Sequence, residues 1–403
     1  MTPLRILFLT DNFPPEVNAP ASRTFEHCRE WVRAGVAVTV ITGAPNFPQG
    51  KVQAGYRNRL WQREEMEGIR VIRVWTYITA NEGFVKRTLD YISFALMGSL
   101  AALLVRTDLI VATSPQFFTA LGGWWAALLK RKKWVMEVRD LWPESIRAVG
   151  AMREGRLYRW LERCELFLYR QAAAVVVVTE SFRADLVRRG ICSDKVFVVK
   201  NGVLLDAFSP RERDALLARR LGLEGKFVVG YLGTHGMAHR LDFILNCAAK
   251  CPQDLHFLFI GDGAEKLRLG EQVARLHLSN VTLLPPVPKQ EVARYISLTD
   301  VALVPLRKHD TFKTVLPSKI FENAALRRPI LLGVEGEAAQ LIEAYQAGAC
   351  FEPENEDDFL TQLIRLQQDH AFYQHCQRGA ARLSAAFDRR RLALDMLAVL
   401  TQL

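Results

Sequence analysis

Residues 316–332 combine a polar turn, a short predicted helix and an apolar strand, and this segment carries the clearest chemistry in the chain. Pro317 and Ser318 suit the first positions of a helix, where free backbone N–H groups and the positive end of the helix dipole can hold phosphate oxygens. Lys319 adds a mobile cation at the same place. Glu322, about one turn further along, could accept two hydrogen bonds from a cis-diol such as a ribose. Together these groups indicate a nucleotide site, and the alternative is an ordinary amphipathic helix with a glutamate on its solvated face.

Two further turns could hold phosphate, because each follows an apolar strand. Residues 233–241 form a turn that leads into a helix, and they include Arg240, whose guanidinium could bind a phosphate through two hydrogen bonds. A surface arginine on an exposed helix is the alternative for Arg240. The sequence Gly-Asp-Gly at 261–263 suggests a dinucleotide turn, but no third glycine follows at the fingerprint spacing, so this signal is weak.

Three side chains suited to an acceptor molecule follow the predicted strand 133–138. Asp140 has Arg139 beside it and Trp142 near it, so it could take a proton from an acceptor hydroxyl or fix that hydroxyl by a hydrogen bond. Trp142 suits the face of a sugar, and an aspartate that caps the next helix is the alternative for Asp140. Arg23, in the first turn of another predicted helix, could hold an anionic acceptor group or could be an ordinary helix-surface arginine.

Length and composition indicate a two-domain protein of a reducing compartment. With 403 residues, half of them hydrophobic, the chain is too long for one typical core. Its seven cysteines are scattered and include no Cys-x-x-Cys pair, which fits free thiols. Cys247, Cys251 and His256 make a poor zinc site, so we predict no metal centre there. Residues 4–10 resemble a first strand rather than a signal peptide, and we expect a cytoplasmic protein.

Two uncharged runs are candidate membrane segments. The run 91–105 is shorter than the roughly 20 residues that cross a bilayer. The run 109–129 is longer, but it divides into a strand, a turn and a helix. We therefore expect no membrane-spanning helix.

The net charge of +10 is compatible with nucleic acid, an anionic membrane or anionic substrates. Five arginines recur at helical spacing beside apolar residues: Arg153, Arg156, Arg159, Arg163 and Arg170. Such a basic amphipathic face could lie on anionic lipid headgroups, as the neighbouring pair Lys86 and Arg87 also suggests, and a solvated helix face is the alternative. Because no aromatic stacking platform accompanies these residues, a nucleic-acid partner is not expected.

Strands alternate with helices along the whole chain, which indicates an α/β protein with parallel sheets covered by helices. The strands expected in the first half are 5–10, 37–42, 69–74, 109–113, 133–138 and 174–179. Those expected in the second half are 227–232, 256–260, 281–284, 301–304 and 330–332. An Asn-Gly turn places the boundary after residue 203, giving domains 1–203 and 204–386. Two doubly wound domains in series predict a ligand cleft at the strand ends between them.

The segment 316–332 resembles the donor-binding helix of the family 4 (GT4) retaining glycosyltransferases, whose pattern is Glu, seven residues, Glu. Glu322 matches the second Glu, and Thr314 stands at the first. The resemblance covers almost the whole chain and implies the GT-B fold, with two facing Rossmann-like domains and residues 387–403 crossing back to the first. Asn18 opens an Asn-Ala-Pro sequence in place of a glycine pair, as in the WbuB-like L-fucosamine transferase branch.

The resemblance assigns roles to the candidate donor-side residues. Family members carry a cation at the position of Thr234 and another at that of Arg240, so Lys319 could supply the second charge here. The implied donor-binding residues are Gly233, Thr234, Arg240, Gly261, Pro286, Val287, Thr314, Ser318, Lys319 and Glu322. The candidate acceptor-binding residues are Asn18, Arg23, Arg139 and Trp142, and the candidate catalytic residues are Asp140, Arg240 and Lys319.

The activity that the resemblance implies is sugar transfer with retention by a metal-independent, hexosyltransferase-type enzyme. The expected donor is a UDP-sugar, with N-acetyl-L-fucosamine as the candidate sugar, and the expected acceptor is a polyprenyl-diphosphate-linked saccharide of O-antigen or capsule synthesis. The enzyme would then sit at the cytoplasmic face of the inner membrane, on its anionic surface. Two alternatives stay open: a UDP-sugar epimerase or hydrolase of the same fold, and a non-catalytic lipid- or partner-binding subunit.

Overall fold

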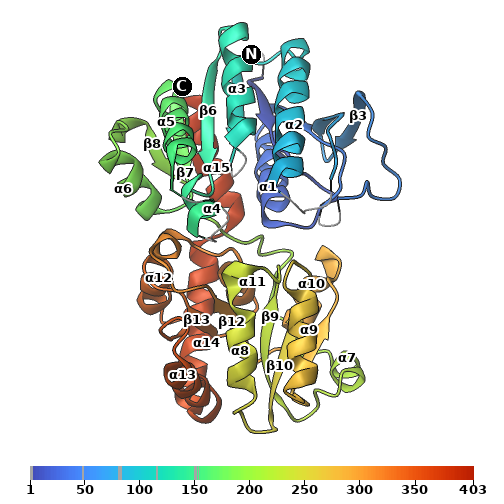
Figure 1. Ribbon diagram of the computed structural model, residues 1–403, viewed down its shortest axis with the longest axis vertical. Helices are drawn as coiled ribbons and strands as arrows, with labels where there is room; N and C mark the ends of the chain where they lie inside the picture. Colours follow the sequence, from blue (N-terminus) through green and yellow to red (C-terminus); the bar gives the residue numbers. More distant parts are fainter. Residues whose placement is uncertain (1–2, 48–49, 80–83, 115–116, 149–151, 153) are drawn as a thin grey trace. The chain divides into compact units, whose positions relative to one another are not determined.

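The computed structural model describes residues 3–47, 50–79, 84–114, 117–148, 152 and 154–403 (Figure 1). The chain divides into two compact units, one formed by Met1–Lys200 with Arg389–Leu403 and the other by Asn201–Asp388. The limits expected from the sequence, 1–203 and 204–386, stay predictions of the domain boundaries. Each unit has its own sheet and its own core, so each is described by itself.

The first unit contains an eight-stranded sheet in the order β3-β4-β2-β1-β5-β6-β7-β8. The strands are β1 (Arg5–Leu9), β2 (Ala37–Thr42), β3 (Trp61–Met66), β4 (Ile69–Val74), β5 (Leu109–Thr113), β6 (Lys133–Val138), β7 (Ala174–Val177) and β8 (Val196–Val198). The pairs are parallel, apart from the antiparallel pair of β3 with β4. The central strands are buried on both faces and are therefore apolar without alternation. The strand order reverses at β1 and β5, which is where ligands collect in open α/β sheets.

Helices cover both faces of this sheet. They are α1 (Ala19–Arg33), α2 (Phe84–Leu104), α3 (Phe117–Lys130), α4 (Glu144–Ala148), α5 (Arg156–Gln171), α6 (Glu180–Arg188) and α15 (Arg389–Thr401), with a 3-10 turn η1 (Ser193–Lys195). Side chains of α2, α3 and α5 share one core cluster with Leu7 and Leu9 of β1. Phe8 points to the opposite face, as strand alternation requires, and its ring lies 6.0 Å from that of Trp31 in α1. Trp31 also donates to the carbonyl oxygen of Ala393 at 2.8 Å, which joins α15 to this unit.

The second unit contains a six-stranded sheet in the order β11-β10-β9-β12-β13-β14, with parallel pairs throughout. Its strands are β9 (Phe227–Leu232), β10 (Leu255–Ile260), β11 (Val281–Leu284), β12 (Val301–Pro305), β13 (Ile330–Gly333) and β14 (Gly348–Cys350). The order reverses between β9 and β12, so the carboxyl ends of these two strands form the expected ligand edge. Both sheets thus confirm the doubly wound α/β class.

The helices of the second unit pack on both sheet faces (Figure 1). They are α7 (Ala215–Arg220), α8 (Leu241–Ala248), α9 (Lys266–Arg275), α10 (Lys289–Ile296), α11 (Lys319–Ala325), α12 (Glu337–Tyr345), α13 (Glu356–Gln368) and α14 (His370–Ala386), with 3-10 turns η2 (Met237–His239) and η3 (Asp310–Thr314). The predicted helix after Pro317 is α11, which begins at Lys319 with Ser318 at the N-cap.

The two uncharged runs differ in outcome. The run 109–129 forms β5 and α3, as predicted. The run 91–105 belongs to a longer helix than expected, because α2 extends from Phe84 to Leu104. Among the described residues, this one helix is long and apolar enough to cross a membrane, over Lys86–Leu104, with 28% of that window buried. The expectation that this segment is too short to span is therefore wrong on length.

Candidate active site

Lys319 is the first residue of α11, and its side chain reaches the end of β9. The Nζ atom lies 3.8 Å from the centroid of the Tyr231 ring, a cation–π contact. This atom is buried and has no hydrogen-bond partner among the described residues. Burial lowers the pKa of Lys319 to about 7, and the charge of Glu322 acts in the opposite direction. A buried ammonium without a partner favours an arriving anion, because an unpaired buried charge is costly.

Gly233 brings the end of β9 close to this ammonium, and Gly261 brings the end of β10 close to Gly233. Gly233 follows β9 with φ +145°, and a Cβ there would lie 2.9 Å from Lys319 Nζ. Gly261 follows β10 with φ +150°, and a Cβ there would lie 1.8 Å from the carbonyl oxygen of Gly233. Side-chain-bearing residues rarely adopt either conformation. Both positions therefore require glycine, and the backbone can approach a ligand closely at this edge of the sheet.

Two histidines to which the sequence interpretation gave no role lie beside Tyr231, and the charge of Lys319 acts on both. Both ring nitrogens of His235 and the Nδ1 of His239 are buried without hydrogen-bond partners in the part of the chain that the structure describes. Their rings lie 5.9 and 5.7 Å from the Tyr231 ring. Burial, together with nearby lysines, lowers the pKa of His235 to about 4 and that of His239 to about 3. Both histidines are therefore neutral at pH 7. Their position in a glycine-rich turn after a strand is the sequence signal that could have identified them as site residues.

The other predicted residues of the 316–332 segment have different environments. Ser318 has helical backbone angles and makes no side-chain cap hydrogen bond. Glu322 lies in the same helix turn as Lys319 and is half-buried. The Thr314 hydroxyl donates to the carbonyl oxygen of Thr311 at 2.8 Å within η3. Thr314 therefore closes a local turn and cannot offer the carboxylate that family members have at this position.

Arg240 is already paired with two carboxylates. Its Nε donates to Asp242 at 3.0 Å and its NH1 to Glu354 at 2.5 Å. It lines a hollow of about 180 Å³ together with Arg268 and Arg307. A phosphate would have to compete with these two carboxylates for the Arg240 guanidinium, whereas the ammonium of Lys319 has no such competitor among the described residues.

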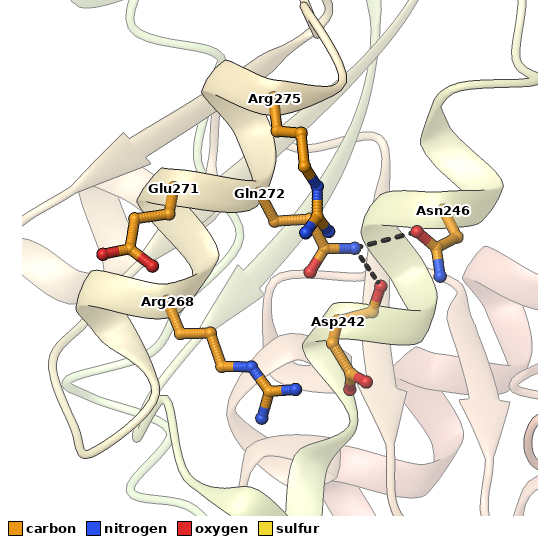
Figure 2. A pocket seen from close by; sticks show the side chains of 6 residues that line it. All are labelled: Asp242, Asn246, Arg268, Glu271, Gln272 and Arg275. Atoms are coloured by element: carbon orange, nitrogen blue, oxygen red, sulfur yellow. Dashed lines mark hydrogen bonds between the residues drawn. The ribbon is translucent and has the colours of Figure 1, made fainter.

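A larger hollow of about 320 Å³ lies between α8 and α9 (Figure 2). Its lining residues are Asp242, Asn246, Arg268, Glu271, Gln272 and Arg275. The Gln272 side chain bridges the two helices, because its amide nitrogen donates to Asn246 Oδ1 and to the Asp242 carbonyl oxygen, each at 2.8 Å. None of the residues predicted to form the site lines this hollow, and the Gln272 hydrogen bonds in it join the two helices.

The remaining donor-side residues lie in loops at strand ends. Thr234 is exposed, and its carbonyl oxygen accepts a hydrogen bond from the Tyr231 hydroxyl at 2.6 Å. Pro286 is exposed and Val287 is half-buried, in the loop after β11, two strands away from β9 in the sheet order. Val287 packs against the cluster that contains Leu223.

In the first unit, Asp140 follows β6 at the carboxyl edge of the sheet. Burial raises the pKa of Asp140 to about 6, although the adjacent Arg139 charge opposes this shift. Asp140 caps no described helix through a hydrogen bond, so the structural alternative receives no support. A carboxylate with a pKa near 6 is suited to accept a proton near neutral pH.

Arg139 and Trp142 are partly committed to the protein itself. The Arg139 NH1 donates to the carbonyl oxygen of Pro20 at 3.1 Å, and burial lowers the pKa of Arg139 to about 10. The Trp142 ring stacks on Phe117 with centroids 5.0 Å apart and planes inclined by 13°. One face of the Trp142 ring is therefore covered.

Two acceptor-side predictions need correction. Arg23 is buried, and its guanidinium donates to Glu137 at 2.8 Å and to the carbonyl oxygens of Val199 and Lys200 at 2.9 Å. It therefore holds the end of the first unit together and does not face an acceptor. Asn18 is the N-cap of α1: its Oδ1 accepts from the Ala21 N–H, and its amide donates to Asn12. Both polar ends of Asn18 are used inside the protein.

The described side chains include no candidate metal site. No group of three or more His, Cys, Asp or Glu residues within them is arranged to hold a metal ion. All seven cysteines are free, including Cys247 and Cys251. Independence from metals stays a prediction.

Comparisons with known families cover most of the chain. Residues 18–202 match the family described as "Glycosyl transferase 4-like domain", and residues 226–369 match the family described as "Glycosyl transferases group 1". A relative in Escherichia coli, "Putative colanic acid biosynthesis glycosyl transferase WcaI", is 26% identical over 369 residues, covering 87% of this chain and 89% of WcaI.

Solved structures share the fold at low sequence identity. Sucrose-phosphate synthase from Thermosynechococcus elongatus has a TM-score of 0.81 at 18% identity, covering 99% of this chain and 98% of its own. HepE of Anabaena, in complex with UDP and glucose, has a TM-score of 0.74 at 17% identity, covering 99% of this chain and all of its own. These structures confirm the GT-B fold predicted from the sequence. The family matches and the similarity to WcaI confirm the predicted hexosyltransferase-type enzyme class. The chain is therefore a glycosyltransferase of the GT-B fold, composed of a glycosyl transferase 4-like domain followed by a glycosyl transferases group 1 domain.

Proposed function

We propose that this glycosyltransferase transfers a sugar from a UDP-sugar, with retention, to a polyprenyl-diphosphate-linked saccharide in the synthesis of a bacterial surface polysaccharide. The observation that carries the donor side is the ammonium of Lys319, which is buried beside the Gly233 backbone and has no hydrogen-bond partner in the described parts of the chain. HepE binds UDP and glucose, and WcaI is described as acting in colanic acid biosynthesis, which supports the nucleotide and the pathway class. We propose N-acetyl-L-fucosamine as the sugar, because the Asn-Ala-Pro sequence that begins at Asn18 resembles that of the WbuB-like branch.

The chemistry follows from the charge that develops as the glycosidic bond to UDP breaks. The anomeric carbon loses its bond to the β-phosphate oxygen, the electron pair stays on that oxygen, and the acceptor hydroxyl oxygen forms the new bond. Lys319 would neutralise the leaving diphosphate, and this electrostatic stabilisation would be the largest catalytic contribution. Glu322 would hold the ribose hydroxyls, and Ser318 would donate to a phosphate oxygen. We assign no direct phosphate contact to Arg240 in its present pairing with Asp242 and Glu354.

On the acceptor side, Asp140 would take or hold the proton of the attacking hydroxyl, and the free face of the Trp142 ring would contact a sugar. The transfer would need no divalent cation, because lysine and backbone groups supply the positive charge. We also propose a peripheral location on the cytoplasmic face of the inner membrane, where a lipid-linked acceptor resides. The exposed arginines of α5 support that location: Arg156, Arg159, Arg163 and Arg170. Arg153, which the sequence places on the same face, lies outside the described residues.

Calorimetric titration with UDP, GDP and ADP, with EDTA and again with Mg²⁺, tests the donor assignment. We expect selective binding of UDP that does not depend on Mg²⁺, that weakens in Lys319→Met and Glu322→Ala, and that is unchanged in the control Lys250→Met, whose ammonium is exposed. Failure to bind any of the three nucleotides would refute the proposal and leave a non-catalytic subunit as the better account.

A second assay separates transfer from hydrolysis or epimerisation. UDP release from UDP-sugars would be followed with and without a polyprenyl-diphosphate-linked acceptor. Release that requires the acceptor supports transfer. Equal consumption of the donor without the acceptor would favour the hydrolase or epimerase alternative.

A further inference from the structure

Helix α2 is apolar on two opposite faces, and the first unit covers only one of them. Its inner face packs in the core through Phe94, Ala101 and Ala102, and a Cβ on Gly98 would lie 3.7 Å from the Ile41 side chain of β2. Its outer face exposes large apolar residues at intervals of three and four: Leu89, Ile92, Leu96, Leu100 and Leu104. Such spacing places the five side chains in one stripe along the helix. A soluble helix would carry polar residues there.

The stripe continues onto α3, which lies beside α2 (Figure 1). The two helices approach closely, because a Cβ on Gly122 would lie 2.7 Å from the Ser99 hydroxyl and 2.9 Å from the Ala95 carbonyl oxygen. The outer residues of α3 that are exposed are Leu121, Trp125, Leu128 and Leu129. No acidic residue occurs in α3.

Helix α5 extends the same surface. The Trp124 ring of α3 contacts the Phe167 ring of α5 edge to face, with centroids 5.3 Å apart. Leu157, Trp160 and Phe167 of α5 are exposed, and Trp160 has 58% of its surface free. We call the outer surface of α2, α3 and α5 the apolar helical face.

Basic side chains border the apolar helical face. The exposed arginines of α5 lie next to its apolar residues, and Lys86 and Arg87 stand at the beginning of α2. At the ends of α2 and α3, the exposed basic residues are Arg106, Arg131 and Lys132. The two acidic residues of α5, Glu162 and Glu165, both pair with Arg189, which follows α6, and so do not oppose this charge.

We propose that the apolar helical face inserts into one leaflet of an anionic lipid bilayer, with α2 lying in the plane of the membrane and the basic border on the headgroups. Apolar side chains bounded by Lys and Arg match the acyl region and the anionic headgroups in that order. A spanning α2 is excluded, because its inner face belongs to the core of a sheet domain and could not be exposed to lipid on all sides. This surface deepens the peripheral location proposed above and rests on it, whereas it does not depend on the chemistry of sugar transfer.

Flotation of the full chain with vesicles tests this surface. The vesicles would be neutral phosphatidylcholine or a mixture with phosphatidylglycerol. We expect binding to the anionic vesicles and a loss of about 100-fold in Leu96→Glu/Leu100→Glu, since each half-exposed leucine contributes about tenfold when lipid covers it. The control Leu216→Glu/Leu267→Glu changes two leucines of the second unit that are more exposed than Leu96 and Leu100, and it should bind as wild type.

Further measurements distinguish the contribution of the arginines from that of the leucines, and a loss of binding from a loss of folding. Arg159→Glu/Arg163→Glu should weaken binding to anionic vesicles by about tenfold or more and leave binding to neutral vesicles unchanged. UDP binding and thermal unfolding of each variant would show that it is folded and that its donor site is intact. The proposal is overturned if wild type binds neither vesicle, if the Leu96/Leu100 variant binds as wild type, or if light scattering shows that this face instead joins two copies of the chain.

Discussion

The pH dependence of UDP binding should report the protonation of Lys319 directly. In the free protein, burial lowers the pKa of Lys319 to about 7, so near pH 7 about half of the molecules carry the charge. A bound diphosphate favours the charged form and raises this pKa, so binding takes up protons. Binding is then strongest below pH 7 and is lost as pH rises through that value.

The magnitude follows from the charged fraction. This fraction falls from about one half at pH 7 to about one hundredth at pH 9, so the affinity should fall by up to roughly 50-fold over that range, and by no more than the loss caused by removing the ammonium. Because the terminal phosphate of UDP should be fully ionised above its second pKa of about 6, the ligand contributes little to the change. Replacing Lys319 by methionine should lower the affinity about 10- to 100-fold at pH 7 and leave it constant up to pH 9.

The assay is calorimetric titration at several pH values in buffers of different ionisation enthalpy, which gives the affinity and the number of protons taken up. Lys250→Met is the control for loss of an exposed ammonium, and its profile should match wild type. An affinity that does not change between pH 7 and pH 9, or an equal fall in Lys319→Met, would show that Lys319 does not bind the diphosphate.

Four further predictions concern single residues. Lys319→Met should raise the melting temperature of the ligand-free protein by about 2–4 °C for each kcal/mol gained. Because burial lowers the pKa of Lys319 in the folded protein, the unfolded chain binds more protons than the folded one between about pH 7 and pH 10, and the lysine destabilises the fold at pH 7. An unchanged or lower melting temperature at pH 7 would contradict the buried ammonium. Asp140→Asn should lower kcat by about 100-fold or more and leave UDP binding unchanged. The kcat of the wild type should rise as the pH passes about 6, because Asp140 then loses its proton. A transfer assay that shows neither effect would contradict a catalytic role of Asp140. Gly233→Ala should weaken UDP binding, since alanine is strained at φ +145° and its Cβ would displace Lys319 Nζ, whereas Gly270→Ala, whose Cβ meets nothing within 4 Å, should bind normally. Equal calorimetric titrations of the two variants would contradict the close approach. Arg23→Met should lower the free energy of unfolding by about 3–5 kcal/mol, because a buried carboxylate loses its partner; normal stability in denaturant unfolding with a raised KM for the acceptor would restore the acceptor role.

The fold class could be predicted from the sequence because strands of a buried parallel sheet are continuous runs of apolar residues. The predicted strand 69–74 matches β4, whereas β3 was missed. The sequence of β3, Trp-Gln-Arg-Glu-Glu-Met, has no β-branched residue, and the strand forms as the edge partner of a hairpin. Its two-residue turn places Glu67 at φ +46° and Gly68 at φ +80°, a geometry that tight hairpins favour.

The candidate site was predictable where neighbours in sequence create it. Lys319 and Glu322 share one helix turn, and Gly233 ends a recognisable strand, so short-range patterns located all three. The pairing of Arg240 with Glu354 depends on a residue more than a hundred positions away, which no local pattern contains. The same holds for Arg23, whose partners include Glu137 and the Val199 carbonyl.

A crystal structure of the complex with UDP would test the central claim most directly. We predict a diphosphate oxygen within about 3 Å of Lys319 Nζ and the ribose hydroxyls on the Glu322 carboxylate. UDP bound elsewhere, with the ammonium of Lys319 still buried and unpaired over Tyr231, would contradict the account.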